Sequence, residues 1–134
     1  MANLTILNFN VKGVSSFEKR CKIFTEIILQ NPDIAILTET HAIPDDLAQY
    51  KAHWQQLGGF ESFWAPSDSR SKGVAILFWK SQNNFVINTS EILIAHRVLS
   101  VQIIIDKQSF NVVALYAPNS PIERRTFFPK FGRN

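Results

Sequence analysis

The sequence is short of cysteine and of long hydrophobic stretches. Its single cysteine, Cys21, excludes an internal disulfide and is interpreted as a small core residue of a helix. No apolar run approaches the roughly 18 residues of a membrane span, since the longest are strand-sized pieces such as residues 34–37. The N-terminus lacks the basic start and apolar stretch of a secretion signal. We therefore expect neither a disulfide scaffold nor a membrane partner.

Repeats, low-complexity segments and an interdomain linker are absent too, and no charge of one sign dominates. A chain of 134 residues, 46% of them hydrophobic, suits one globular unit and is too short for two. The net charge of +3 lies in residues 120–134, which carry four basic residues and one acid. This basic tail predicts either a contact with phosphates or a solvated helix face.

The first forty residues have the pattern of a strand, a helix and a second strand. Residues 4–9 are apolar and β-prone. Ser15 and Glu18 fit a capping box with Ser15 as N-cap, and the helix should end near Gln30 because Asn31-Pro32 disfavours its continuation. Residues 34–37 predict a strand buried on both faces, which completes an α/β unit.

The rest of the chain is rich in strands. A second helix should open at Pro44 and close at Gly58-Gly59. Strands are expected at residues 61–64, 74–79, 85–88, 98–105 and 110–116, the last two forming a hairpin. A final helix should begin near Ser120. The predicted class is a layered α/β (α+β) protein with a mixed or antiparallel sheet and flanking helices.

Polar residues follow several of these strands. They are Asn10, the segment Glu39-Thr40-His41, the segment Ser71-Lys72-Gly73, and the segment Tyr116-Ala117-Pro118-Asn119. Each has an ordinary explanation as a turn residue, a solvated strand end or a loop tip. In open α/β sheets, however, chemistry gathers at strand ends.

Six segments in the same order carry a resemblance to a known family. They are Leu7-Asn8-Phe9-Asn10-Val11-Lys12-Gly13, Asn31-Pro32-Asp33-Ile34, Thr38-Glu39-Thr40-His41, Ser71-Lys72-Gly73-Val74-Ala75-Ile76-Leu77, Leu115-Tyr116-Ala117-Pro118-Asn119, and Glu123-Arg124-Arg125 with Phe127-Phe128. Together they resemble the endonuclease/exonuclease/phosphatase superfamily, which has the DNase I-like fold. The closest similarity is to the apurinic-endonuclease-like endonucleases of LINE-type retrotransposons. Thr38 departs from the usual glutamine.

The resemblance implies a site for cleaving DNA phosphodiesters. Glu39 would bind Mg²⁺ or Mn²⁺ with help from Asn10, and Tyr116 would donate to a phosphate oxygen. Asn119, Lys12 and His41 would contact the substrate. Phosphodiester cleavage also needs an activated water and a stabilised leaving oxygen.

Two parts of the family pattern are missing from this sequence. These are the Gly-Asp-x-Asn segment, which flanks the attacking water, and the Ser-Asp-His segment, whose histidine contacts the phosphate. Residues 1–134 are therefore interpreted as the amino-terminal half of one domain, with weak metal binding and uncertain activity. The missing carboxyl-terminal half would be a partner, and exposed sheet edges would allow self-association.

Two alternatives remain open. The chain is either a nuclease domain of retroelement origin or an inactive remnant that at most binds metal or nucleic acid. Within the superfamily, a phosphatase or lipid phosphodiesterase is the other reading, although the Tyr-Ala-Pro-Asn and Glu-Arg-Arg segments favour nucleic acid. The remaining histidines, His53 and His96, are interpreted as surface or structural residues. The sequence does not identify the compartment; an intracellular one with access to DNA, such as the nucleus, is compatible.

Overall fold

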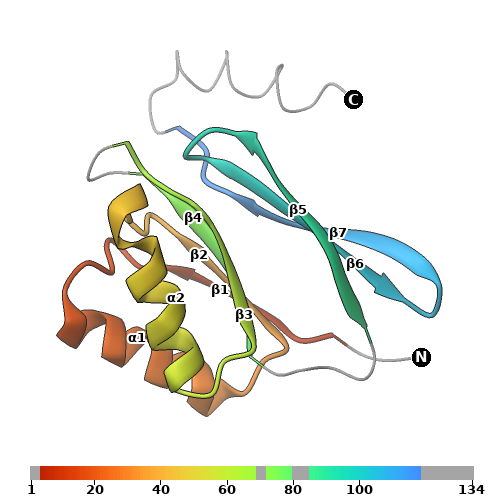
Figure 1. The fold of residues 1–134 in the computed structure, drawn as a ribbon, viewed down its shortest axis with the longest axis horizontal. Helices are drawn as coiled ribbons and strands as arrows, with labels where there is room; N and C mark the ends of the chain where they lie inside the picture. Colours follow the sequence, from red (N-terminus) through yellow and green to blue (C-terminus); the bar gives the residue numbers. More distant parts are fainter. Residues whose placement is uncertain (1–3, 69–71, 80–84, 119–134) are drawn as a thin grey trace.

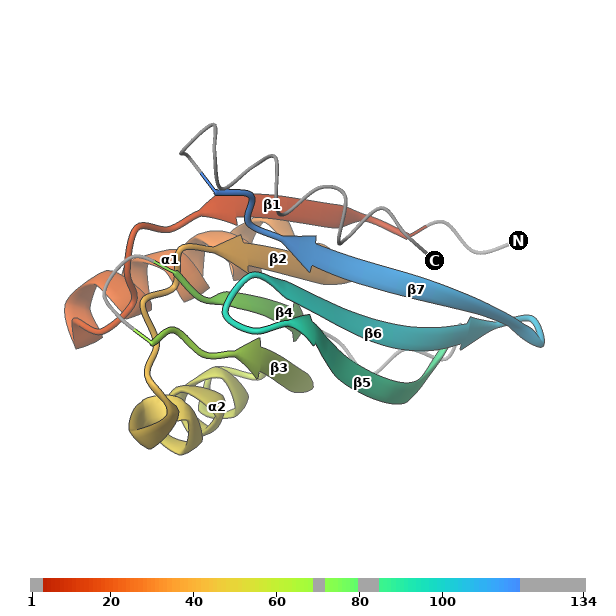
Figure 2. The same cartoon turned by 90° about the horizontal axis from the view of Figure 1, so that it is seen from above.

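The structure is a computed structural model that describes residues 4–68, 72–79 and 85–118. Two sheets lie face to face, and two helices cover the outer face of the larger sheet (Figures 1 and 2). The larger sheet has the strand order β1-β2-β4-β3 and the smaller has the order β5-β6-β7. This arrangement confirms the layered α/β expectation, with a mixed sheet and flanking helices.

The amino-terminal unit consists of β1 (Ile6–Asn10), α1 (Phe17–Gln30) and β2 (Ile34–Thr38). β1 and β2 run parallel, as a strand-helix-strand unit requires. The predicted N-cap was wrong by one residue, because the hydroxyl of Ser16, and not that of Ser15, accepts from the Lys19 amide. Asn31 ends the helix as predicted, in the left-handed conformation.

The next elements complete the larger sheet. A short 3-10 helix, η1 (Pro44–Asp46), leads into α2 (Leu47–Gln56), so the proline begins a 3-10 turn and the α-helix starts later than expected. β3 (Glu61–Ala65) and β4 (Val74–Phe78) follow, and β4 pairs antiparallel with both β2 and β3. Neither helix of the described ranges is long and apolar enough to cross a membrane.

The smaller sheet contains β5 (Val86–Ile94), β6 (Val98–Ile105) and β7 (Gln108–Leu115), all antiparallel. β6 and β7 form the predicted hairpin, whose turn residues Asp106 and Lys107 both have positive φ, typical of a type I′ turn. β5 ends six residues later than the predicted strand at 85–88. Its polar middle is solvent-exposed at a sheet edge, and for this reason it lacks a clear hydrophobic signal.

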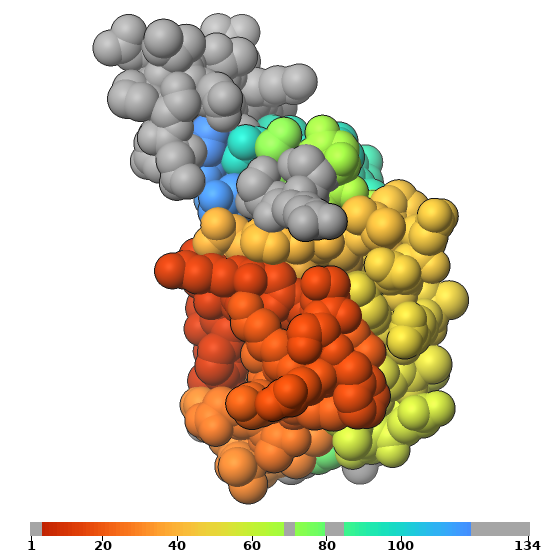
Figure 3. Space-filling view, turned by 90° about the vertical axis from the view of Figure 1, so that its left-hand side faces the viewer, coloured from red at the N-terminus to blue at the C-terminus, as the bar shows by residue number. Residues whose placement is uncertain are grey.

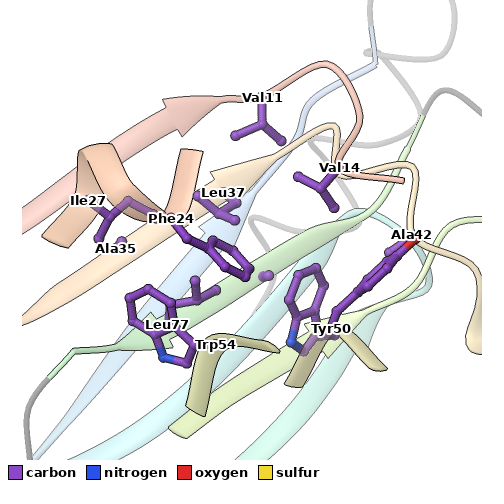
Figure 4. Packing of buried hydrophobic residues seen from close by; sticks show 12 residues of the cluster. Val11, Val14, Phe24, Ile27, Ala35, Leu37, Ala42, Tyr50, Trp54 and Leu77 are labelled. Carbon is purple, nitrogen blue, oxygen red and sulfur yellow. The ribbon is translucent and has the colours of Figure 1, made fainter. Parts of the chain in front are cut away.

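Alternation along β4 explains the two layers of core. Every residue of β4 is buried, yet Ala75 and Leu77 pack toward the helices, whereas Val74, Ile76 and Phe78 pack toward the smaller sheet. Figure 4 shows the helix-side cluster, in which aromatic rings from α1 and α2 meet the sheet. The other cluster joins the two sheets through aliphatic side chains and the rings of Phe78 and Phe85. The larger sheet is therefore fixed on both faces.

One side of the sandwich is open between β1 and β7. Each of these strands pairs with one neighbour among the described strands, so each has a free edge. A groove of about 900 Å³ lies here, and its lining includes Ile6, Ile103 and Phe110. Ile6 and Phe110 are 41% and 44% exposed, so apolar surface remains open to solvent on this side.

Candidate functional site at the strand ends

The parallel pairing of β1 and β2 brings two predicted segments to one edge of the sheet. Asn10 is the register partner of Thr38, so the segments after both strands leave the sheet together. They stay paired beyond the strands through three backbone hydrogen bonds: Val11 N to Thr38 O (3.0 Å), Gly13 N to Glu39 O (2.7 Å) and Val14 N to Thr40 O (2.9 Å). The chain after β1 (red) lies against the chain after β2 (orange) on the face shown in Figure 3.

The Glu39-Thr40-His41 segment is also held from its other side. The Thr40 amide donates to the Gly73 carbonyl at 3.0 Å, and the His41 amide donates to the Lys72 carbonyl at 2.8 Å. Glu39 and His41 have φ values of 56° and 57°, which non-glycine residues rarely adopt. Such strain persists where surrounding contacts over-determine the backbone, and it clusters at functional sites.

Glycine is needed at two positions around this segment. Gly13 and Gly73 have φ values of 99° and 103°, and a Cβ at either would crowd the segment. At Gly13 the crowding atom would be Nδ1 of His41, and at Gly73 it would be the Thr40 hydroxyl. The loop that ends at Gly13 and the pair Lys72-Gly73 therefore lie against the same segment from two sides.

Tyr116 reaches Glu39 from the other sheet. Its hydroxyl donates to Oε1 of Glu39 at 3.1 Å, across 77 positions in sequence. Tyr116 follows β7, and its amide donates to the Arg97 carbonyl at 2.9 Å. Arg97 in turn donates to the Tyr116 carbonyl at 3.3 Å and lies over its ring at 5.5 Å. The site thus forms where the two sheets meet.

Three other predicted site residues, Asn10, Lys12 and His41, belong to the two segments that are paired after β1 and β2. Lys12 is exposed, and its carbonyl accepts from Lys19 Nζ at 2.7 Å. His41 is half-buried, and Asn10 is exposed at the strand end. Asn119, Ser71 and the basic tail from Arg124 to Arg133 lie outside the described residues.

His41 is the site residue whose protonation is most affected by its surroundings. Burial lowers its pKa, the negative charge of Glu39 raises it, and Lys19 lowers it; the net effect is downward. The imidazole is therefore kept neutral near neutral pH, with one ring nitrogen able to accept a hydrogen bond.

The acidic content of this site is low. Within the described ranges, no group of three or more histidine, cysteine, aspartate or glutamate side chains could together hold a metal ion. Glu39 supplies a half-buried carboxylate, one oxygen of which accepts from Tyr116 and the other of which remains for a cation. Mg²⁺ accepts one or two carboxylates and keeps several waters, so these residues fit a weakly held ion.

Sequence reasoning missed several residues around the site. Arg97 was not predicted to belong to the site. No sequence pattern indicates that an arginine before a strand contacts Tyr116, which lies 19 positions later. His96 lies 2.7 Å from the Pro66 carbonyl and 3.6 Å from Asp68, while its own carbonyl accepts from the Gly73 amide. Its structural interpretation agrees with these contacts, which support the loop beside Thr40.

Comparison with known proteins gives structural matches only. No family model and no curated protein sequence matches the chain. An AP endonuclease from Leishmania major superposes with a TM-score of 0.76 at 16% identity, covering 96% of this chain and 46% of that one. An AP endonuclease from Archaeoglobus fulgidus superposes with a TM-score of 0.73 at 17% identity, covering 96% of this chain and 49% of that one.

A third match is D. rerio TDP2 complexed with a single-strand DNA product, with a TM-score of 0.64 at 20% identity. The superposition covers 97% of this chain and 55% of the TDP2 chain. The chain thus spans about half the length of the structures it matches. A 3'-5' exonuclease from Neisseria meningitidis also matches, with a TM-score of 0.69 at 20% identity, so AP endonucleases and an exonuclease are among the structures that this chain resembles. The chain therefore has a partial version of the fold of these structures, which is DNase I-like.

Proposed function

We propose that the chain is a metal-dependent phosphodiesterase domain of endonuclease type that acts on DNA. The hydrogen bond from Tyr116 to Glu39 is the observation that carries this proposal. It joins a carboxylate after one parallel strand to a phenol after the hairpin of the other sheet. A carboxylate for a hard cation beside a donor for a phosphate oxygen is what phosphodiester cleavage needs on its substrate side.

Each residue has a defined task in this proposal. Glu39 and Asn10 hold Mg²⁺ or Mn²⁺, which when bound neutralises charge on the scissile phosphate. Tyr116 has one hydroxyl proton, which it would turn from Glu39 to a phosphate oxygen when DNA and a cation bind, and Lys12 and His41 contact the DNA backbone. Burial lowers the pKa of His41, which favours the neutral imidazole as a hydrogen-bonding contact. Asn119 would be a further backbone or sugar contact.

The domain is proposed to be the amino-terminal half of a complete one, of LINE-type retroelement origin. The chain covers about half of its structural neighbours, and the groove between β1 and β7 lies open with two free strand edges. A carboxyl-terminal half would extend the sheets at these edges and add the water-activating residues. Within the described ranges, no group of three or more acidic, histidine or cysteine side chains could hold a metal ion. This observation supports a second candidate function, a remnant that binds metal or DNA without cutting it.

Weak binding of a divalent cation at Glu39 is the direct test of this site. Titration with Mn²⁺ should broaden the amide NMR signals of Gly13 and Thr40, and Glu39→Gln should weaken this binding by about tenfold or more, since it removes the charge that a hard cation prefers. Glu26→Gln is the matched control, because Glu26 is an exposed carboxylate on α1 that accepts from Gln30. Equal Mn²⁺ affinity in the wild type and in Glu39→Gln would contradict the proposal of a metal site at Glu39.

Self-association through the open groove is a separate expectation. Without a partner half, apolar surface and free edges should make the chain associate as concentration rises. Phe110→Lys places a charge in the groove and should shift sedimentation toward monomer. Leu29→Lys is the control, because Leu29 is 74% exposed on α1 and outside the groove. Monomeric sedimentation of the wild type at every concentration would contradict this expectation.

A further inference from the structure

A buried arginine lies directly beneath the loop that carries Lys12 and Gly13. Arg20 is 1% exposed, and within the described ranges no carboxylate forms an ion pair with it. Its guanidinium carbon lies 4.5 Å from the ring centre of Tyr50 and 5.6 Å from that of Phe17. A buried charge needs hydrogen-bonding partners to offset the loss of its water, so its acceptors indicate what it holds in place.

The acceptors of Arg20 come from two different elements. Nη1 donates to the Val14 carbonyl at 3.0 Å and to the Ser15 carbonyl at 3.3 Å. Nε donates to Nδ1 of His53 on α2 at 2.8 Å. One side chain of α1 therefore links the loop after β1 to the second helix.

His53 is fixed in the form that can accept this hydrogen bond. It is 8% exposed, stacked on Phe17 at 5.0 Å and packed against Phe24 at 5.1 Å. Because Nδ1 accepts from Arg20, the neutral ring carries its proton on Nε2, which lies 3.6 Å from Sγ of Cys21. Cys21 is half-buried beside this ring, and not fully buried as the sequence indicated.

The Val14 peptide connects this network to the candidate site. Its carbonyl accepts from Arg20, and its amide donates to the Thr40 carbonyl at 2.9 Å. The preceding residue, Gly13, donates to the Glu39 carbonyl at 2.7 Å. The loop is thus held from below by Arg20 and in turn holds the strained backbone of Glu39 and His41 from one side.

We propose that Arg20 is a positioning residue of the candidate site and that neutral His53 is its fixed acceptor. Together they hold the loop of residues 11–14 against the segment of residues 39–41, and so set the backbone that presents Glu39. The inference deepens the proposed function and rests on it only for the importance of Glu39. Its test measures backbone protection, whereas the proposed function is tested by metal binding, so the two can fail separately.

The arrangement requires His53 to stay unprotonated. A proton on Nδ1 would remove the acceptor and place two cations 2.8 Å apart in a buried position. The titratable and charged groups that face His53 are Arg20 and Cys21, both from α1. Its other contacts are with the rings of Phe17 and Phe24. Asp46 does not contact His53, because its carboxylate accepts from the Tyr50 hydroxyl on the other side of Arg20. Burial lowers the pKa of His53, and Arg20 lowers it further.

The sign of the pH effect follows from this lowered pKa. Above about pH 6.5, the usual pKa of histidine, both the folded and the unfolded chain carry neutral His53, and the network is fully formed. Below that value the unfolded chain binds the proton first. The contribution of the network to stability therefore falls as pH drops toward the folded pKa.

Amide hydrogen exchange followed by NMR tests the proposal on the full chain. Protection factors of the Gly13 and Val14 amides would be compared with that of Val101 in β6, a buried reference. His53→Leu removes the acceptor and should lower protection of the two loop amides by about tenfold relative to Val101, the effect of losing a hydrogen bond to a charged group. His53→Asn, whose Oδ1 replaces Nδ1, should keep protection near the wild-type level.

Measuring loop protection as a function of pH distinguishes protonation of His53 from protonation of His41, whose ring lies beside Gly13. Loop protection in the wild type should fall below about pH 6.5, the usual histidine pKa. It should stay flat in His53→Asn and still fall in His41→Gln. An unchanged loop in His53→Leu, or a pH response that disappears only in His41→Gln, would overturn the proposal. If His53→Leu does not fold, the wild-type and His53→Asn profiles decide the question.

Discussion

The isolated 134-residue chain is expected to nick supercoiled plasmid DNA in Mg²⁺ at a rate below detection. Glu39 is the carboxylate of the described site, and the Gly-Asp-x-Asn segment, whose aspartate would flank the attacking water, is missing from the sequence. Losing general-base assistance typically costs about 10²–10⁴-fold in rate. Losing a principal electrostatic contact to the transition state costs about another 10²–10³-fold, although such losses do not simply add.

The assay compares the wild type with Glu39→Ala and with Glu26→Gln as a matched carboxylate control. Equal, background nicking by all three is the expected result. Nicking by the wild type and Glu26→Gln that is lost in Glu39→Ala would show that a second copy, or His41, completes the site. Nicking that persists in Glu39→Ala would identify a contaminating nuclease. Binding to DNA that weakens steeply with salt would support the non-cutting alternative.

Most of the fold could be predicted because local pattern and tertiary role agree. The run at residues 74–79 contains no polar residue, and β4 is buried on both faces between two core clusters. The hairpin was predicted with a turn at residues 106–108, and the turn proved to be one residue shorter, because Gln108 already pairs with Ile105 at the start of β7. The predicted N-cap failed because Ser15 and Ser16 offer the same hydroxyl, and only the path of the preceding loop selects between them.

The hydrophobic pattern predicted only the first part of β5. Positions 88–91 of this strand are polar and exposed, and its pairing with β6 shifts register between Ile87 and Thr89 and between Ile92 and Ile94. A regular alternation of apolar and polar residues is therefore lost. The strand exists because it pairs with β6, not because its own sequence demands it.

The candidate site was predictable in part from resemblance and not from any local signal. Glu39 and Tyr116 each look like ordinary strand ends, and only the packing of two sheets joins them. The buried role of Arg20 had no signal at all, since an arginine in the first turns of a helix is usually solvated. Its partners are two loop carbonyls and His53, 33 positions away. Roles of this kind emerge only from three-dimensional contacts.

Trp54 connects the α-helical layer to the larger sheet. Trp54 has no exposed surface, and its indole nitrogen donates to the Phe78 carbonyl at 3.1 Å, which ties α2 to β4 (Figure 4). Its ring packs against Phe24 of α1 at 5.2 Å and against Trp79 at 5.7 Å. A Cβ at Gly59 would overlap the indole, so the turn after α2 closes directly over it.

Trp54→Ala is therefore expected to lower the free energy of unfolding by about 3–5 kcal/mol, the usual cost of deleting a buried tryptophan. Small domains have about 5–15 kcal/mol of stability in total, and a small sandwich with an open groove between β1 and β7 belongs at the low end. The variant should therefore be largely unfolded by circular dichroism. Leu29→Ala, at a position 74% exposed on α1, should change stability by less than about 0.5 kcal/mol. A cooperative urea transition in Trp54→Ala with the wild-type midpoint would mean that the helices are not held to the sheet through this residue.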